Sequence, residues 1–309
     1  MATNTLNGLT ADIISQATLP VLLPGLARLK SFSTDFSAEV QNAGETVVTR
    51  TPSSFTASTW NSTNKYVASN ATTTPISVTL GDPKYVQVEF TPKEAAKIGF
   101  DRLRQIFIEP MAYAVVKGMQ DAALGLVVKD TGGDLDTNAL LMTNISSWDR
   151  SKVVTVAKTL SAAGNPETGR SMHLGVDAYY QLISDNTVAQ AFSIGGAEAI
   201  RNNAIGTLHG LMTYETQSIG SQAYSATSTL KGIAATQDAF MIASRAPAVM
   251  ASDYADSVSV TEPTTGFTFT VSSWYNHDEG MHKLRAEWLF GAAILRKKSI
   301  VPILVGSAI

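Results

Sequence analysis

The strongest constraint on the fold is a helical pattern that covers residues 90–128. It opens with an initiation signal: Thr91 can cap a helix, Pro92 stands where the first turn needs no N–H, and Glu94 completes a capping box. Apolar residues then recur at the spacing of a buried helix face, at Ala96, Phe100, Leu103, Phe107, Met111, Val115, Met119, Ala122 and Leu126. Helices average about 11–12 residues, so this length predicts a helical spine on which the rest of the chain is built.

Pro110 interrupts the pattern near its middle. Proline lacks an N–H and its ring clashes with the preceding turn, so the sequence predicts two helical segments, the second with Pro110 in its first turn. The bend between them is our candidate for a hinge in the spine.

The segment before the spine, residues 44–90, alternates as β-strands do. Strands are expected over residues 44–50, 76–80 and 85–90, the last one after a Gly-Asp-Pro turn. Between the first two strands, from Thr51 to Thr74, half of the residues are Ser or Thr, a composition that is typical of a flexible linker.

Aromatic residues argue against a simple linker, because Phe55, Trp60 and Tyr66 lie within this polar stretch. A long two-stranded flap that docks on a neighbouring subunit accounts for both the polar composition and the aromatics, since an isolated hairpin is marginal in water. We therefore take these three residues, together with Lys65 at the flap tip, as candidate inter-subunit contacts. The flexible linker remains the alternative.

The first 43 residues contain an amphipathic stretch, residues 11–27, that is broken by Pro20 and Pro24. Two prolines in so short a stretch disfavour a compact domain. The sequence predicts an extended arm that carries one short helix and lies on another surface.

The part of the chain after the spine mixes both kinds of element. A turn-rich break over residues 129–138 is the best candidate boundary. Helices are expected over residues 146–160 and 177–183, and strands over residues 170–176, 211–215, 240–243, 267–271, 283–295 and 300–305. The predicted fold class is α+β.

Charge and composition exclude several classes of protein. The chain has 23 basic and 26 acidic residues, a net charge of −3, and no long basic run, which argues against tight binding of nucleic acid. The absence of cysteine excludes disulfides, thiolate metal sites and a cysteine nucleophile. No apolar run approaches the ~20 residues of a membrane helix, and the amino terminus lacks the basic region of a signal peptide.

Enzyme motifs are scarce: the sequence has no GxSxG elbow, GxGxxG fingerprint or Walker loop. The nearest is Asp130-Thr131-Gly132, which matches the triplet of aspartic proteases. Those enzymes need two carboxylates that share a proton, so with one triplet the chain would have to act as a homodimer. A turn is the simpler interpretation.

Two sets of residues suggest a metal-binding site, but neither has the spacing of a known metal motif. Asp130, Asp134 and Asp136 depart from the calcium loop of an EF-hand, and its usual glutamate is missing. His277 and His282, with Glu279 between them, are five residues apart, unlike the four-residue spacing of HExxH. No catalytic, cofactor or metal site is therefore expected.

Several strings, taken in order, resemble those of phage coat proteins. They are GETVVTRTPSSF at residues 44–55, FTPKE, EPM and QD within residues 90–121, GNP and RSMHL within 164–174, IGTLHG and YE within 205–215, and LRAEWLFG at 284–291. The whole chain resembles the Hong Kong 97 fold, the major capsid protein fold of tailed bacteriophages, which encapsulin nanocompartments share.

The resemblance implies an assignment for each part of the chain. Residues 1–43 would be the N-terminal arm, 44–90 a β-hairpin called the E-loop, 91–137 the spine helix and peripheral P-domain, 138–265 the axial A-domain, and 266–309 the return strands of the P-domain. Such subunits assemble as pentamers and hexamers into an icosahedral head that encloses double-stranded DNA without reading its sequence.

It also implies partners and a location: a portal, a possible decoration protein, and assembly in the host cytoplasm into a virion, with no membrane. About ninety residues precede the spine, which leaves no room for a fused scaffolding segment, so a separate scaffolding protein is expected. Some relatives cross-link a lysine of the E-loop to an asparagine of a neighbour. Lys65 lacks a matched asparagine and acid, so cross-linking is not expected.

Two alternatives stay open at this point. An encapsulin shell has the same fold and encloses an enzyme cargo, and the proline-broken segment of residues 11–26 does not exclude its N-terminal helix. The less favoured alternative is the homodimeric aspartic protease that would use Asp130.

Overall fold

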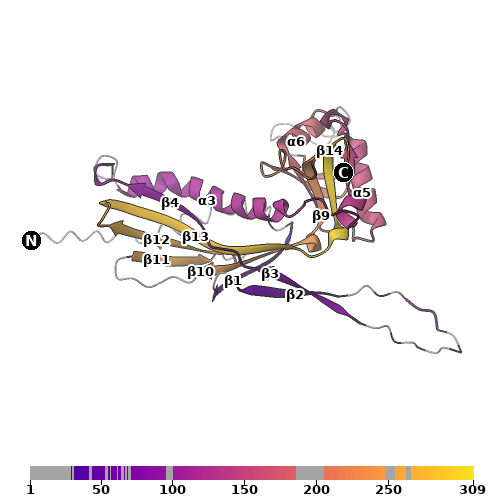
Figure 1. Ribbon diagram of the computed structural model, residues 1–309, viewed down its shortest axis with the longest axis horizontal. Helices are drawn as coiled ribbons and strands as arrows, with labels where there is room; N and C mark the ends of the chain where they lie inside the picture. The colour runs from indigo at the N-terminus through magenta and orange to yellow at the C-terminus, as the bar shows by residue number, and fades with distance from the viewer. Residues whose placement is uncertain are drawn as a thin grey trace, which may run out of the picture.

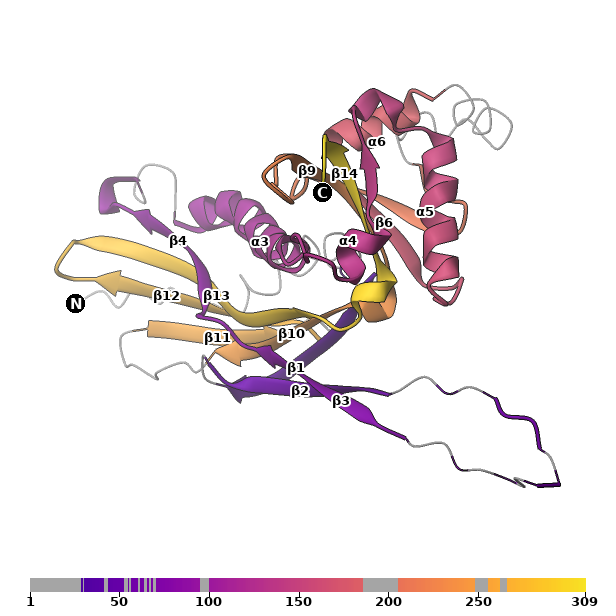
Figure 2. The ribbon, with the colours of Figure 1, turned by 45° about the vertical axis from the view of Figure 1, so that its right-hand side comes forward.

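The computed structural model describes residues 29, 31–41, 44–52, 55, 57–60, 62–63, 66, 68, 71–94, 100–185, 205–247, 255–261 and 266–309. These residues form two bodies, each built on a six-stranded sheet, and a two-stranded hairpin that projects from them (Figure 1). The helical spine lies along the first sheet, and the second sheet packs with shorter helices at one end of the spine (Figure 2).

The first sheet is organised around its longest strand, β13 (Met281–Ile294). The first half of β13 pairs antiparallel with both β12 (Thr268–Asn276) and β4 (Lys84–Phe90). Its second half pairs antiparallel with β10 (Phe240–Pro247), and β11 (Ala255–Thr261) extends the sheet beyond β12.

The remaining strand of this sheet comes from the segment predicted to be an extended arm. β1 (Ser33–Gln41) pairs in parallel with β10, with Ser33 opposite Met241. The sequence predicted an extended arm that lies on another surface, and residues 33–41 are extended and pair with β10 of the same chain. The assignment of residues 1–43 to an arm stays a prediction. The predicted helix within residues 11–27 lies outside the described residues.

Helix α3 (Phe100–Gly125) covers one face of the first sheet (Figure 1). Its buried side chains, Met111, Val115 and Met119 among them, share one core with Leu284 and Trp288 of β13. The predicted capping box is confirmed. The backbone N–H of Thr91 donates to the Glu94 carboxylate at 2.9 Å, and the Glu94 N–H donates to the Thr91 hydroxyl at 3.3 Å.

The expected break at Pro110 does not occur, because α3 is one helix from residue 100 to residue 125 with Pro110 inside it. Pro110 is exposed, and its missing N–H removes one hydrogen bond without ending the helix. The two-segment prediction is therefore wrong. Whether Pro110 acts as a hinge stays a prediction.

The projecting hairpin consists of β2 (Thr46–Pro52) and β3 (Thr73–Thr79), which pair antiparallel. Figure 2 shows that it leaves the first sheet and extends well beyond it. At its base, Val78 and Leu80 are fully buried against Leu289 of β13 and Met241 of β10. The hairpin is thus mounted on the sheet face opposite α3.

The second sheet has mixed pairing and its own core. Its strands, in spatial order, are β5 (Leu140–Met142), β14 (Ile300–Gly306), β9 (Ser228–Thr236), β6 (Arg170–Gly175), β8 (Leu211–Thr216) and β7 (Thr207–Leu208). Helices α5 (Arg150–Ala162) and α6 (Val176–Ile183) share its core, in which Trp148 is fully buried. The short helix α4 (Asp134–Asn138) contacts β14.

The two sheets divide the chain differently from the predicted ranges. β10 and β11 belong to the first sheet although they lie within residues 138–265, and β14 belongs to the second sheet although it lies within 266–309. The chain crosses between the bodies once between α3 and α4, and twice more at short 3-10 turns, η2 (Gln237–Ala239) and η3 (Lys297–Ser299). The sequence identifies β14 as a strand, but an apolar run does not specify which sheet it joins.

Candidate functional site

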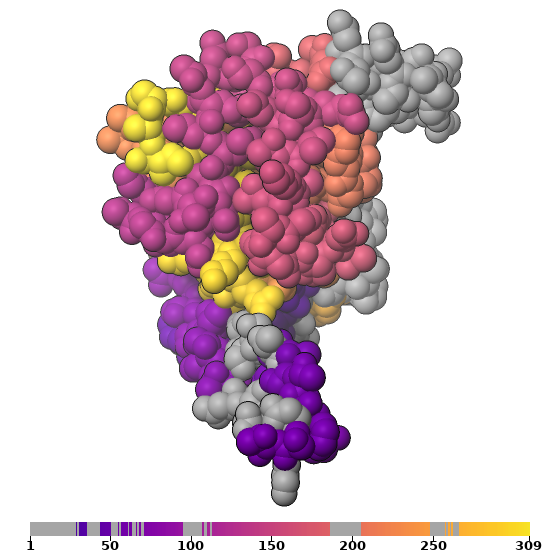
Figure 3. Space-filling model, turned by 90° about the vertical axis from the view of Figure 1, so that its right-hand side faces the viewer, coloured from indigo at the N-terminus to yellow at the C-terminus, as the bar shows by residue number. Residues whose placement is uncertain are grey.

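Strands β2 and β3, with the described residues between them, project from the body as a flap. Its docking on a neighbouring subunit stays a prediction. Phe55, Trp60 and Tyr66 are 62%, 55% and 90% exposed. Lys65 lies outside the described residues. Single exposed aromatics are ordinary, but three of them on one projecting segment mark a surface that is available for a partner. Figure 3 views the molecule from the side on which the flap projects.

The base of the flap is fixed firmly to the body. The N–H of Gly44 donates to the carbonyl of Leu80 at 2.8 Å, and the N–H of Leu80 donates to the carbonyl of Glu45 at 2.9 Å. The N–H of Gly81 donates to the carbonyl of Phe290 in β13 at 3.2 Å. The flap therefore leaves the sheet in a set direction while its aromatic residues stay exposed.

Charged side chains lie toward the other end of β13, away from this base. Lys283 lies between Glu89 of β4, at 3.2 Å from its ammonium, and Glu279 of the β12–β13 turn. The hydrogen bond to Glu279 raises the pKa of Lys283, and the hydrogen bond from Lys283 lowers the pKa of Glu89. These charges hold two strands and a turn together.

The residues weighed for zinc are not arranged around a common point. Glu279 pairs with Lys283, and the rings of His277 and His282 pack on Tyr275, with centroids 5.0 and 4.7 Å away. Among the residues that the structure describes, no three His, Cys, Asp or Glu side chains are grouped so that they could hold a metal ion.

Asp130 of the protease-like triplet is engaged in a structural network. Its carboxylate accepts a hydrogen bond from Lys297 at 3.0 Å, and its N–H donates to Asp136 at 3.1 Å. Burial alone would raise the pKa of Asp136, but the hydrogen bonds from Tyr224, at 2.6 Å, and from the Asp130 backbone lower it. Burial and Asp136 raise the pKa of Tyr224 in turn. This geometry holds the loop against α4 and η3 and leaves Asp130 paired with a cation instead of a second carboxylate.

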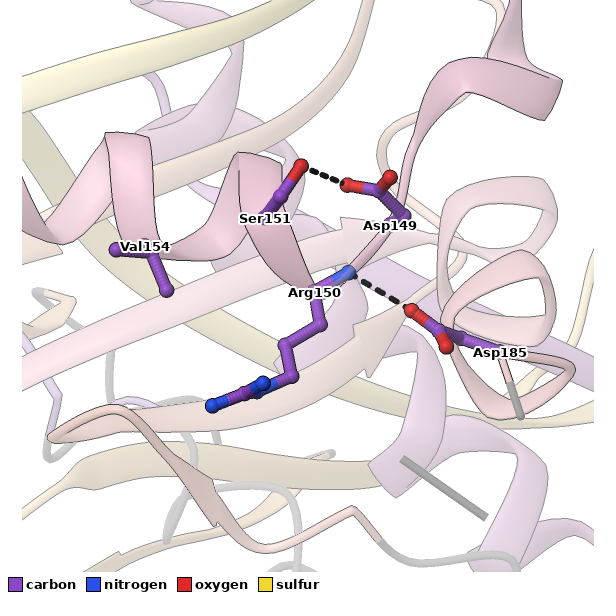
Figure 4. Close-up of a pocket in the computed structure, with 5 residues that line it drawn as sticks. All are labelled: Asp149, Arg150, Ser151, Val154 and Asp185. Carbon is purple, nitrogen blue, oxygen red and sulfur yellow. Dashed lines mark hydrogen bonds between the residues drawn. The ribbon is translucent and has the colours of Figure 1, made fainter. Parts of the chain in front are cut away.

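The hollow drawn in Figure 4 has a volume of about 460 Å³ and lies at the start of α5. Its acids make structural hydrogen bonds: Asp149 caps the helix by accepting from the Lys152 N–H, and Asp185 accepts from the Arg150 N–H. The Ser151 hydroxyl, which donates to Asp149, lowers the pKa of that carboxyl. Ser151 therefore has a carboxylate beside it, and no histidine lies among the described residues that line the hollow; the nearby His209 accepts a hydrogen bond from the Arg150 guanidinium at 3.0 Å.

Comparison with known proteins gives a consistent result at the level of structure. Neither a protein-family model nor a curated protein matches the sequence. Solved structures do match. The chain aligns with a structure from Mycobacterium phage Che8 at TM-score 0.55 and 15% identity, over 85% of this chain and 88% of that one. It aligns with the capsid of cyanophage P-SCSP1u at TM-score 0.56 and 10% identity, over 90% and 87%.

The third match covers nearly the whole molecule. It is the capsid of a native GTA particle, at TM-score 0.56 and 10% identity, over 99% of this chain and 95% of that one. The chain has a phage capsid fold. The resemblance inferred from the sequence is therefore confirmed for the fold.

Sequence reasoning located the exposed part of this capsid fold and missed its anchors. The flap aromatics stood out because a linker has no use for them. Nothing local marks Asp35 of β1 as the partner of Arg245, which is 210 residues away and donates to its carboxylate at 2.8 Å. Phe32, which is fully buried, likewise lies in a segment that reads as mixed and polar. No described helix of this capsid fold is long and apolar enough to span a membrane.

Proposed function

We propose that this chain is the major capsid protein of a tailed phage, a structural subunit that carries no catalytic site. It self-assembles as pentamers and hexamers into an icosahedral head that encloses double-stranded DNA. The observation that carries the proposal is the match to the capsids of a cyanophage and of a GTA particle over most of both chains, together with a projecting flap whose aromatics are exposed.

Each part then has a role in the shell. The flap is the E-loop, α3 is the spine, the first sheet forms the P-domain and the second sheet the A-domain. Phe55, Trp60 and Tyr66 contact a neighbouring subunit, because aromatic rings supply most of the binding energy at interfaces when a partner buries them. Lys65, which precedes Tyr66 in the sequence, is a further candidate contact. A net charge of −3 suits a container that does not grip DNA.

The partners follow from the same proposal. A separate scaffolding protein guides assembly in the host cytoplasm, a portal occupies one vertex, and a decoration protein can bind the finished virion. No membrane and no cofactor take part.

Negative-stain microscopy and sedimentation of the expressed chain, alone and with the candidate scaffold, test the proposal. Uniform icosahedral particles or capsomers support it, and a stable monomer under both conditions overturns it. Shells that enclose an enzyme instead of DNA would establish the encapsulin alternative.

A paired variant tests the role of the flap. W60S with Y66S removes two exposed rings and leaves the buried base at Val78 and Leu80 intact. We expect the variant to unfold at the wild-type temperature and to sediment as free subunits. Y180S is the matched control, because Tyr180 is 44% exposed but lies on α6, away from the flap. Normal shells from W60S/Y66S would contradict the proposed contact.

A further inference from the structure

A short segment before β1 is buried between the two bodies. Leu29 and Phe32 are 0% and 1% exposed and belong to the main core. The Phe32 ring packs edge-on against Phe240, the first residue of β10, with centroids 5.1 Å apart. It also stacks on His173 of β6 at 4.9 Å, with the two planes 23° apart. Phe32 therefore touches the first sheet and the second sheet at once.

The contact with the second sheet is extended by a further ring and a hydrogen bond. His173 stacks on Tyr214, its neighbour in β8, at 5.2 Å and 22°. The hydroxyl of Ser31 lies 2.9 Å from Nε2 of His173, within hydrogen-bond distance. Phe32, His173 and Tyr214 form a row of nearly parallel rings, and His173 is 3% exposed.

The segment is held to the first sheet by a second, separate anchor. The guanidinium of Arg245 in β10 donates to the Asp35 carboxylate at 2.8 Å and to the Asp35 backbone carbonyl at 2.9 Å. Among the described strands β1 pairs only with β10, so β1 lies at the end of the sheet order. A strand with one neighbour can leave a sheet without breaking any other pairing.

The connections between the bodies place Phe32 at their hinge. Phe240 directly follows η2, and the N–H of Leu295, before η3, donates to the carbonyl of Ala239 in η2 at 2.8 Å. Two of the three crossings of the chain, those at η2 and η3, are therefore short and adjacent, and the third joins α3 to α4. Short adjacent connections are suited to rotation of one body against the other. Side chains packed beside such an axis limit that rotation.

We propose that Leu29 and Phe32 form a removable wedge that sets the angle between the two sheets. While Phe32 is packed between Phe240 and His173, the sheets hold one relative orientation. When the segment withdraws together with β1, the sheets lose this contact and the angle between them varies more widely, while β9 and β14 still share a core with α3. The proposal does not depend on the assembly state of the chain.

Distance measurement between two spin labels tests this, and the absence of cysteine makes the labelling clean. K84C places one label on an exposed position of β4 in the first body, and K158C places the other on an exposed position of α5 in the second. Labelled full-length chain is diluted in unlabelled chain, so only distances within one chain are recorded. The wild-type distribution should be narrow.

The decisive comparison is between two buried phenylalanines. F32A should broaden the distribution at least twofold. F269A removes an equally buried ring that stacks on Phe267 within the first body, so it should lower the unfolding temperature without broadening the distribution. A distribution in F32A as narrow as the wild type overturns the wedge, as does equal broadening in F269A. If F32A does not fold, F32L takes its place. F32L loses the ring that stacks on His173, so its distribution should be broader than that of the wild type, and an unchanged width counts against the proposal.

Discussion

Gly291 of β13 lies directly beneath Thr79 of β3. A Cβ atom built on Gly291 would stand 2.2 Å from the Thr79 carbonyl oxygen, a backbone atom that cannot move without shifting the flap. We predict that Gly291→Ala destabilises the chain by about 1–3 kcal/mol, the usual cost of forcing a methyl group into a packed site. The free energy of unfolding in urea measures this, and hydrogen exchange at the base of the flap should increase.

The matched control for this prediction is Gly81→Ala. Gly81 lies at the same crossing, but a Cβ there would meet only the Phe290 carbonyl oxygen at 3.8 Å, an ordinary contact. We expect a change within about 0.5 kcal/mol. Equal effects at the two positions would show that the crossing is not tightly packed.

Arg170 is a buried cation that is held by carbonyl groups. It is 6% exposed and donates to the carbonyls of Pro166 at 2.7 Å and Asn165 at 2.8 Å, and to the hydroxyl of Ser161 at 3.0 Å. Arg170 therefore caps the C-terminal end of α5 and holds the loop that follows it. A cation at this end of a helix also interacts favourably with the helix dipole.

Arg170→Ala leaves several buried acceptors without a donor, so we predict a loss of about 3 kcal/mol or more in the free energy of unfolding. Arg170→Lys should recover only part of it, because an ammonium lacks the planar fork. Arg296→Ala is the comparison. Its ion pair with Asp238 is 39% and 44% exposed, and exposed pairs contribute about 0–1 kcal/mol. Similar losses in Arg170→Ala and Arg296→Ala would contradict this account.

The charges around Lys283 predict a pH dependence of stability. Because the pKa of Glu89 is lowered in the folded chain, its contribution is present above the ordinary value of about 4.3 and is lost as the pH falls through the folded value. Because the pKa of Lys283 is raised, its contribution is present below about 10.4 and is lost as the pH rises through the folded value.

Glu89→Gln should therefore flatten the acid limb of the stability curve, so that Tm falls less between about pH 5 and pH 2 than in the wild type. Melting curves across this range test it. Glu167→Gln changes an exposed glutamate elsewhere and should leave the limb unchanged. Parallel curves for Glu89→Gln and the wild type would exclude the contribution of Glu89.

The elements that the sequence predicted well are those whose signal is local. The Thr91–Glu94 box forms as expected, and the strand predictions at residues 85–90 and 211–215 match β4 and β8, because capping and side-chain alternation depend on near neighbours. β9 was missed. Its inner positions include Gly232, Ala234 and Ala235, small residues that strong strand patterns do not feature.

Long-range pairing explains most of what the sequence could not predict. β1 reads as a polar arm, and it becomes a strand only because β10, some 200 residues later, offers an edge and Arg245 a partner for Asp35. The candidate contacts at Phe55, Trp60 and Tyr66 were accessible to sequence reasoning because three aromatics in a Ser/Thr-rich stretch have no local explanation. A buried wedge such as Phe32 has no such signature, since one apolar residue is unremarkable on its own.

Pro110 lies at an exposed position inside the intact helix α3. A proline there costs stability because it removes a helical hydrogen bond, and packing does not require its ring. Replacing it by alanine restores an N–H and a helical hydrogen bond, so Pro110→Ala should raise the free energy of unfolding by up to about 3 kcal/mol. Pro83→Ala, in the turn between β3 and β4, should instead be neutral or slightly destabilising, because it frees the unfolded chain. If Pro110 is the flexing point of the spine in an expanding shell, the stiffer Pro110→Ala particles should also expand more slowly. Expansion at the wild-type rate, despite the higher stability, would show that Pro110 is not a hinge of the spine.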